Sequence, residues 1–185
     1  MHATRRPRAA ITWSFVVAFA AAVSALGTSA QDRAVEYAVK ATFLYKFAAF
    51  VEWPAGAFTS AADPLVICVA GNDGVTALVD DAALGQTVDG HALVVTHLAP
   101  GARMPRCHIL YVAETARPAM AALVDSVAGA PVLTVVDGSA AAGSAVINFV
   151  LQGNRVRFDI DLKAAQRNRL AVSSKLLALA AAVRQ

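Results

Sequence analysis

Polar residues follow three apolar runs of the sequence and are the first candidates for chemistry. Asn72 and Asp73 come after "LVICVAG", Glu114 and Thr115 follow "ILYVA", and Asp137 follows "LTVV". Open α/β sheets place their sites at the carboxyl ends of the strands, so catalytic groups would be sought at these positions. Asp and Asn also favour strand-terminating turns, because their side chains bond to nearby backbone. No nucleophile with an evident base accompanies them, and we predict no catalytic site.

The remaining reactive side chains form no recognisable reaction centre. The stretch "GNDG" at residues 71–74 is too short for a phosphate-binding loop and has no lysine or serine partner. Cys107 and His108 are adjacent, and strand neighbours point to opposite faces, so they make a poor pair of nucleophile and base. His91, His97 and His108 form no ligand-spaced cluster with the cysteines, so no metal site is expected. The residues alone favour a binding or interaction domain without a cofactor.

The first thirty residues have the features of a cleaved export signal. Three arginines form a basic region, residues 11–26 are apolar and uncharged, and small residues end at Ala30. We expect cleavage there, which makes residues 1–30 a signal peptide and residues 31–185 one mature, exported domain. An uncleaved membrane anchor is the alternative, although the apolar stretch is short for a membrane span.

The charge balance argues against nucleic acid as a partner. The chain has 16 Lys and Arg against 13 Asp and Glu, and the three arginines of the export signal account for that excess. The remaining chain is balanced, whereas a phosphate-binding surface would show a basic excess.

Cys68 and Cys107 are the two cysteines of the chain. An even count in an exported chain favours a disulfide, because the compartment outside the cytoplasm is oxidising. Two buried thiols are the alternative that the residues leave open.

Apolar periodicity predicts the elements that position these residues. Residues 36–53 have apolar side chains at helical spacing, and Pro54 marks the end, because the residue before a proline avoids the α region. Short apolar runs predict four strands, with two helices between them. The strands are residues 65–73, 91–98, 107–114 and 131–138, and the helices are residues 74–84 and 117–127. This alternation predicts an α/β fold with a mostly parallel sheet flanked by helices.

The last third of the chain predicts an antiparallel hairpin. Residues 144–162 contain two strand-like runs joined by a turn at residues 152–154. Apolar and charged side chains alternate in the second run, which is typical of a strand at or near a sheet edge. A short helix follows with Asn168 as its left-handed stop, and Ser173 caps a last helix over residues 174–183.

Several of these stretches together resemble the YfiR family of small periplasmic proteins. In order, they are "EYAVKATFLYKFAAFVEWP", "LVICVAG", "CHILYVAE", "VLTVVDG" and "VINFVLQGNRVRFDIDLKAAQRNRLAVSSKLLALA". The resemblance covers residues 34–182 and implies a periplasmic repressor without enzymatic activity. Such a repressor binds the periplasmic sensor domain of a YfiN-type inner-membrane diguanylate cyclase, and so limits cyclic di-GMP and biofilm formation. The family also implies an outer-membrane YfiB-like lipoprotein as antagonist.

Individual positions agree with the family pattern or depart from it. Cys68 and Cys107 match the positions of the family's structural disulfide, and a second cysteine pair found in some members is absent from this sequence. The loop over residues 139–145 has one glycine where the family has an aromatic residue and a double glycine. Asn168 stands where the family usually has glycine.

Two surfaces are candidates for partner contact. On the first helix we expect Val39, Phe43, Phe47 and Phe50 to face the core, which leaves the back face with Tyr45 for homodimer or partner contact. The other surface is the charged face of the last strand with the basic residues after it. Its members are Arg157, Asp159, Asp161, Arg167, Arg169 and Lys175.

Alternatives remain for these surfaces and for the function. An ordinary solvated surface is the alternative for the charged residues. Besides the partner-binding repressor, the residues leave open a periplasmic small-ligand sensor without a cyclase partner and an enzyme of unrecognised type.

Overall fold

The computed structural model describes residues 14–138 and 145–185, and for residues 14–29, 117 and 118 it describes the backbone only. The predicted basic region, with Arg5, Arg6 and Arg8, lies outside the described residues, as do residues 139–144 of the loop that departs from the family pattern. The chain divides into two compact units, Met1–Val35 and Glu36–Gln185, and the second contains the sheet.

Helices and strands alternate along the described chain. The helices are α1 Ser14–Ala48, α2 Gly74–Ala83, η1 (a 3-10 helix) Glu114–Ala116, α3 Arg117–Ser126, α4 Leu162–Arg167 and α5 Ser174–Leu179. The strands are β1 Val51–Glu52, β2 Leu65–Ala70, β3 Thr87–Val88, β4 His91–Leu98, β5 Ile109–Val112, β6 Leu133–Asp137, β7 Ile147–Gln152, β8 Arg155–Asp161, β9 Ala171–Val172 and β10 Ala182–Arg184. In the described part of the chain, no helix combines the length and the apolar character that crossing a membrane requires.

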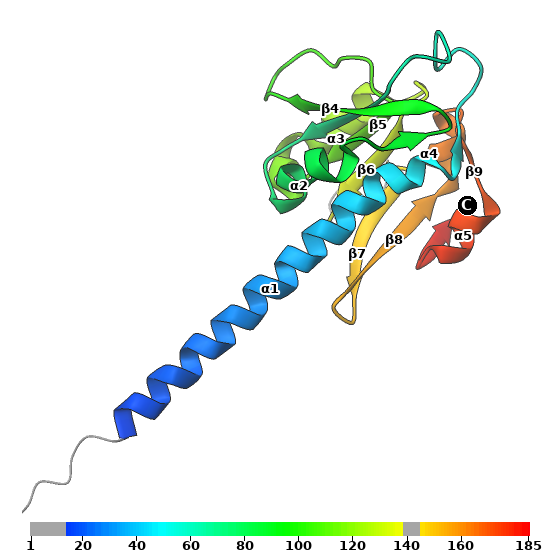
Figure 1. Cartoon of the computed structure of the whole chain (residues 1–185). Helices are drawn as coiled ribbons and strands as arrows, with labels where there is room; N and C mark the ends of the chain where they lie inside the picture. Colours follow the sequence, from blue (N-terminus) through cyan, green and yellow to red (C-terminus); the bar gives the residue numbers. More distant parts are fainter. Residues whose placement is uncertain (1–13, 139–144) are drawn as a thin grey trace, which may run out of the picture. The chain divides into compact units, whose positions relative to one another are not determined.

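Eight strands form one sheet in the order β10-β8-β7-β6-β5-β2-β4-β3 (Figure 1). β4, β2, β5, β6 and β7 are parallel to one another, and β8 returns antiparallel to β7 as the second strand of the hairpin. β10 then lies parallel to β8, and β3 lies antiparallel to β4. The prediction of a mostly parallel sheet flanked by helices, with a C-terminal antiparallel hairpin, is confirmed.

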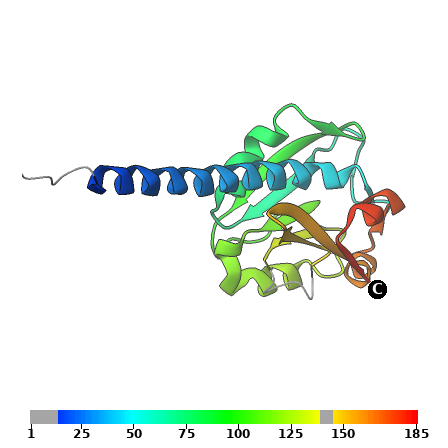
Figure 2. The same cartoon turned by 90° about the horizontal axis from the view of Figure 1, so that it is seen from below.

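Helices cover both faces of the sheet (Figures 1 and 2). The part of α1 from Glu36 onward packs with α2 on one face, where the ring of Phe47 lies 5.8 Å from Phe149 and 5.0 Å from Phe158 between centroids. On the other face, α3 buries Met120 and Val124 against β5 and β6. The sheet therefore separates two apolar cores.

The buried side of α1 is rotated from the predicted one. Val39 was expected in the core but is 36% exposed, whereas Ala41, assigned to the back face, is fully buried. Phe47 is buried, and Phe43 and Phe50 pack against the core while half-buried. The buried side therefore combines Ala41 and Ala48, whose small side chains let the helix backbone lie close to the sheet, with the large side chains of Leu44 and Phe47.

Two predicted helices end early because their last residues become strands. α1 ends at Ala48 rather than Trp53, since β1 pairs antiparallel with β9, with Val51 opposite Val172. α5 ends at Leu179, and β10 joins the sheet where the helix was expected to continue to residue 183.

The predicted left-handed stop at Asn168 is wrong. Asn168 has a φ of −85°, and the left-handed residue is Arg169, with a φ of +58°. The buried side chain of Asn168 explains the difference. It donates a hydrogen bond to the carbonyl of Val132 at 2.8 Å and accepts one from the N–H of Gly129 at 3.1 Å.

Candidate functional site

The carboxyl ends of β2, β5 and β6 line a cavity of about 580 Å³, which we call the acidic cavity. Its walls include four of the strand-end residues considered for catalysis, together with residues of α1 and β7. They are Asp73, Glu114, Thr115 and Asp137 from the strand ends, Glu36, Tyr37 and Lys40 from α1, and Phe149 from β7. The fold thus brings the strand-end carboxylates to one edge of the sheet.

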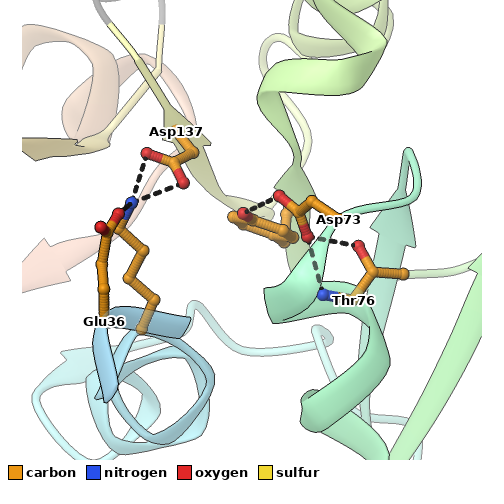
Figure 3. Close-up of polar contacts among 6 residues, drawn as sticks. Glu36, Asp73, Thr76 and Asp137 are labelled. Carbon is orange, nitrogen blue, oxygen red and sulfur yellow. Dashed lines mark hydrogen bonds and ion pairs between the residues drawn. The ribbon is translucent and has the colours of Figure 1, made fainter. Parts of the chain in front are cut away.

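Lys40 is the centre of a buried ion cluster in this cavity. Its Nζ lies 2.7 and 2.9 Å from the two carboxylate oxygens of Asp137 and 2.5 Å from Oε1 of Glu36 (Figure 3). Burial alone would lower the pKa of Lys40, but the hydrogen bonds to Asp137 and Glu36 outweigh burial and raise it. Burial raises the pKa of Asp137, and Lys40 opposes that shift. With three acceptors for its three protons, Lys40 stays protonated and has no lone pair for catalysis.

Asp73 links α2 to the centre of the sheet. Its Oδ1 accepts hydrogen bonds from the N–H and the hydroxyl of Thr76 at 2.8 and 2.9 Å, which caps α2 (Figure 3). Its Oδ2 accepts a hydrogen bond at 3.0 Å from the hydroxyl of Tyr111, a fully buried residue of β5. Burial, together with the charges of Asp73 and Asp137, raises the pKa of Tyr111 far above its usual value. Tyr111 therefore remains a hydrogen-bond donor at any physiological pH.

α1 also approaches α2 very closely beside this cavity. A Cβ atom placed on Gly74, the first residue of α2, would lie 1.9 Å from Cδ2 of Tyr37. Glycine is therefore the residue that lets the ring of Tyr37 lie over the start of α2.

The polar groups of the acidic cavity hold elements together. Asp73 caps α2, and the pair of Lys40 and Asp137 joins α1 to the end of β6. In residues 14–138 and 145–185, no group of three or more His, Cys, Asp or Glu side chains could hold a metal ion. The arrangement joins α1, α2 and the sheet through charge and hydrogen bonds.

The role of Lys40 was missed from the sequence, although two signals were present. Glu36 and Lys40 are four residues apart, with the acid nearer the N-terminus, which is the favourable order on a helix. Lys40 also lies four positions before Leu44, a fully buried residue, and so on the buried side of α1. A lysine on that side needs a buried acidic partner, which the strand-end carboxylate of Asp137 provides.

The predicted partner residues of β8 are partly used within the fold. Arg157 is exposed, and its guanidinium donates a hydrogen bond to the carbonyl of Leu179 at 3.4 Å. Asp159 is half-buried and pairs across the sheet with residues of β7 and β10. Asp161 caps α4 and forms an ion pair with Arg184, with 3.6 Å between Oδ2 and Nε.

The other predicted partner residues lie elsewhere. Tyr45 is half-buried against the first core rather than on a free back face. Arg167, Arg169 and Lys175 are exposed, and Arg169 lines a cavity of about 480 Å³ beside His108. The described contacts do not join Arg157 and Arg169 into one patch.

The disulfide expected between Cys68 and Cys107 is present, with 5.7 Å between the two Cα atoms. It connects Cys68 of β2 to Cys107, which lies two residues before β5 begins. The disulfide lies on the face of the sheet that α3 covers. The disulfide therefore fixes the end of the segment between β4 and β5.

His108 points away from the disulfide into a stack of rings. Its ring lies 4.2 Å from Phe58 between centroids, and Phe58 stacks in turn on His91 at 3.9 Å. Nδ1 of His108 accepts a hydrogen bond from the N–H of Val66 at 3.0 Å, and Nε2 contacts the carbonyl of Ala57 at 3.2 Å. This pattern requires a neutral ring with the proton on Nε2. Burial lowers the pKa of His108, which favours the same state.

Comparison with curated proteins finds no match to the chain. The model of the YfiR/HmsC-like family matches residues 37–181, which extend from Tyr37 beside the acidic cavity to the residue before β10. The match includes the strands that meet at the acidic cavity, the disulfide and the C-terminal hairpin. Because it covers well over half of the chain, the protein belongs to the YfiR/HmsC-like family.

Proposed function

We propose that the protein represses an inner-membrane diguanylate cyclase of the YfiN type by binding its periplasmic domain. Repression would limit cyclic di-GMP synthesis and biofilm formation. The observation that carries this proposal is the family match over residues 37–181, since the family comprises periplasmic regulators of the diguanylate cyclase pathway.

Repression requires export of the protein, and we propose that residues 1–30 are removed on the way. The disulfide between Cys68 and Cys107 supports an oxidising compartment, where such bonds persist. In that compartment, a YfiB-like outer-membrane lipoprotein is the proposed antagonist. Mass spectrometry of the exported protein should find a chain that begins near residue 31.

Repression by contact needs a difference in affinity rather than a reaction. A binding protein shifts the cyclase only as far as it prefers the inactive state, and a preference of about a hundredfold equals about 2.7 kcal/mol. A few well-buried contacts can supply that amount. The engagement of Lys40 by two carboxylates supports a role without catalysis.

The proposed contact surface consists of the predicted partner residues. Among them, the side chains most accessible to a partner are Arg157, Arg167, Arg169 and Lys175. Asp159 and Asp161 would border the surface. We propose Tyr45 as a residue of a homodimer contact. Reversing the charge at Arg157, Arg169 and Lys175 should weaken repression and leave the melting temperature nearly unchanged, because these side chains are exposed.

Deletion of the gene tests the proposal. Cellular cyclic di-GMP and surface attachment should rise, and expression of the full chain should restore both to their original levels. Expression of the chain without residues 1–30 should fail to restore them, since it would leave the protein in the cytoplasm. Unchanged cyclic di-GMP after deletion, under several growth conditions, would refute repression.

A small-ligand sensor without a cyclase partner is the second candidate function. It is favoured by an apolar cavity of about 740 Å³ next to α3, which has the size of a ligand site. A deletion without effect on cyclic di-GMP would make this function the leading one.

A further inference from the structure

The sheet has a topological switch point between β2 and β5. From β2 the chain passes through α2 to β4 on one side of β2, and it then returns to β5 on the other side. Open α/β sheets bind ligands in the crevice outside the carboxyl ends of the strands at such a point. Gly71 follows β2 and Thr115 follows β5 at this crevice, and a Cβ on Gly71 would lie 2.8 Å from Oγ1 of Thr115.

Two cavities border the switch point, and Thr115 lines both. One is the acidic cavity beside α1, where Lys40 is paired with Glu36 and Asp137. The other lies beside α3 and has a volume of about 740 Å³, which is within the range of small-molecule sites. We call it the apolar cavity.

Small side chains create the space in the apolar cavity. Ala119 and Ala122 of α3 form part of one wall. Leu98 and Met104, from the end of β4 and the segment after it, form part of the other wall. α3 is fixed to the sheet by its buried Met120 and Val124, as described above. The segment with Met104 is held three residues later by the disulfide to β2. Because both walls are fixed, the cavity exists without a ligand to form it.

The polarity of the walls restricts the ligand. Among the side chains that the structure describes, those around the apolar cavity include no charged group, so a charged ligand would lose its hydration there without a compensating charge from them. The hydroxyl of Thr115 accepts a hydrogen bond from the N–H of Asn72 at 2.9 Å and can still donate its own proton. Asn72 and Ser126 also line the cavity, and the hydroxyl of Ser126 donates a hydrogen bond to the carbonyl of Leu123 at 2.6 Å. The mostly apolar walls and the hydroxyl of Thr115 fit a neutral ligand that accepts a hydrogen bond there.

We propose that the apolar cavity binds a neutral, largely apolar small molecule with one hydrogen-bond acceptor placed against Thr115. This site goes beyond the proposed repression; it rests on the second candidate function, the small-ligand sensor, and does not depend on a cyclase partner. Binding can therefore be measured with the isolated protein, and it can fail or succeed independently of repression.

The test uses N-phenyl-1-naphthylamine, a neutral probe whose fluorescence rises in apolar surroundings. The full chain is expressed, exported and purified from the periplasm, and probe binding is titrated. Ala119→Phe and Ala122→Phe place a ring in the cavity from two exposed positions of α3. Ala121→Phe is the matched control, because Ala121 is an exposed alanine of the same helix that does not line the cavity. Circular dichroism and melting curves verify folding for each variant.

Wild type and Ala121→Phe should bind one probe per chain saturably, and either cavity variant should weaken binding at least about tenfold. Equal affinity in all four proteins, or no saturable binding by wild type, would overturn the proposal. The anionic analogue 1-anilino-8-naphthalenesulfonate should bind more weakly, and equal binding would contradict the neutral class of ligand. If wild type binds no probe and Ala122→Phe converts a dimer to a monomer in sedimentation, the cavity is an interface between copies and the proposal fails.

Discussion

Replacing Lys40 by methionine tests whether the ion cluster joins α1 to the sheet. Methionine keeps most of the side-chain length but removes the charge, which leaves Asp137 and Glu36 without their cation. Removing one partner of a buried pair costs about 3–5 kcal/mol. The side chains of Asp137 and Glu36 are 13% and 20% exposed, so some hydration remains and the low end applies. We expect a loss of about 3 kcal/mol at pH 7, or roughly 6–12 °C in melting temperature for a domain of this size.

The loss should depend on pH in a defined direction. Burial already raises the pKa of Asp137, and removing Lys40 removes the interaction that opposes that shift. In Lys40→Met, folded Asp137 thus binds its proton more readily than unfolded Asp137. Stability therefore falls as the pH rises from the pKa of unfolded Asp137 through the higher pKa of folded Asp137. The difference in unfolding free energy between wild type and Lys40→Met should therefore shrink as the pH is lowered from 7 toward about 4.5.

Urea unfolding followed by circular dichroism measures these differences. Lys46→Met is the matched control, since Lys46 is an exposed lysine of the same helix and its loss should stay within about 0.5 kcal/mol. Adding Asp137→Leu to Lys40→Met should recover much of the stability, because no buried charge then remains at β6. If Lys40→Met and Lys46→Met unfold with the same free energy, the ion cluster does not stabilise the fold.

Three further outcomes are expected. Thiol titration of the unfolded, unreduced protein should find no free thiol, and Cys68→Ser with Cys107→Ser should lose about 4 kcal/mol, since the bond closes a loop with a sequence separation of 39. Two titratable thiols would contradict the disulfide. Stability should fall as the pH drops below about 6.5, because the unfolded chain binds the proton that folded His108 resists, with a slope of at most about 1.4 kcal/mol per pH unit. An unchanged slope in His108→Asn urea titrations would assign the effect to other groups. Gly74→Ala should cost about 1–3 kcal/mol in the same assay despite the better helix propensity of alanine, and adding Tyr37→Ala should reduce that cost. A stabilised single variant would show that the ring of Tyr37 moves away freely.

The strands and the sheet type were predictable because their signal is local. Runs such as "LVICVA" and "LTVV" are apolar on both faces, which is typical of strands covered by helices on both sides. The alternation in β8 predicted a position near the sheet edge, and β8 is indeed next to the edge strand β10. A pattern with a period of two or of 3.6 residues is complete within a short segment of chain. It can therefore be recognised without knowing which elements pack against that segment.

The errors arose where a distant residue decides the local structure. Asn168 forms its hydrogen bonds with the segment before β6, and this contact moves the left-handed conformation to Arg169. Likewise, α1 stops at Ala48 because β9 pairs with the residues that follow. For the site, the strand-end carboxylates were predictable, whereas the burial of Lys40 depends on how α1 is rotated against the sheet.

The pairing of β1 with β9 has a consequence for folding kinetics. Val51 pairs with Val172, so this small ribbon closes a loop of more than a hundred residues, at an entropic cost on the order of 4 kcal/mol. Such distant pairings form slowly, because the chain must lose this entropy before the contact stabilises it. The end of α1 is thus secured only after most of the domain is available to fold. In a protein that is exported unfolded, as proposed above, this ribbon would close only after the chain as far as Val172 has left the secretion channel.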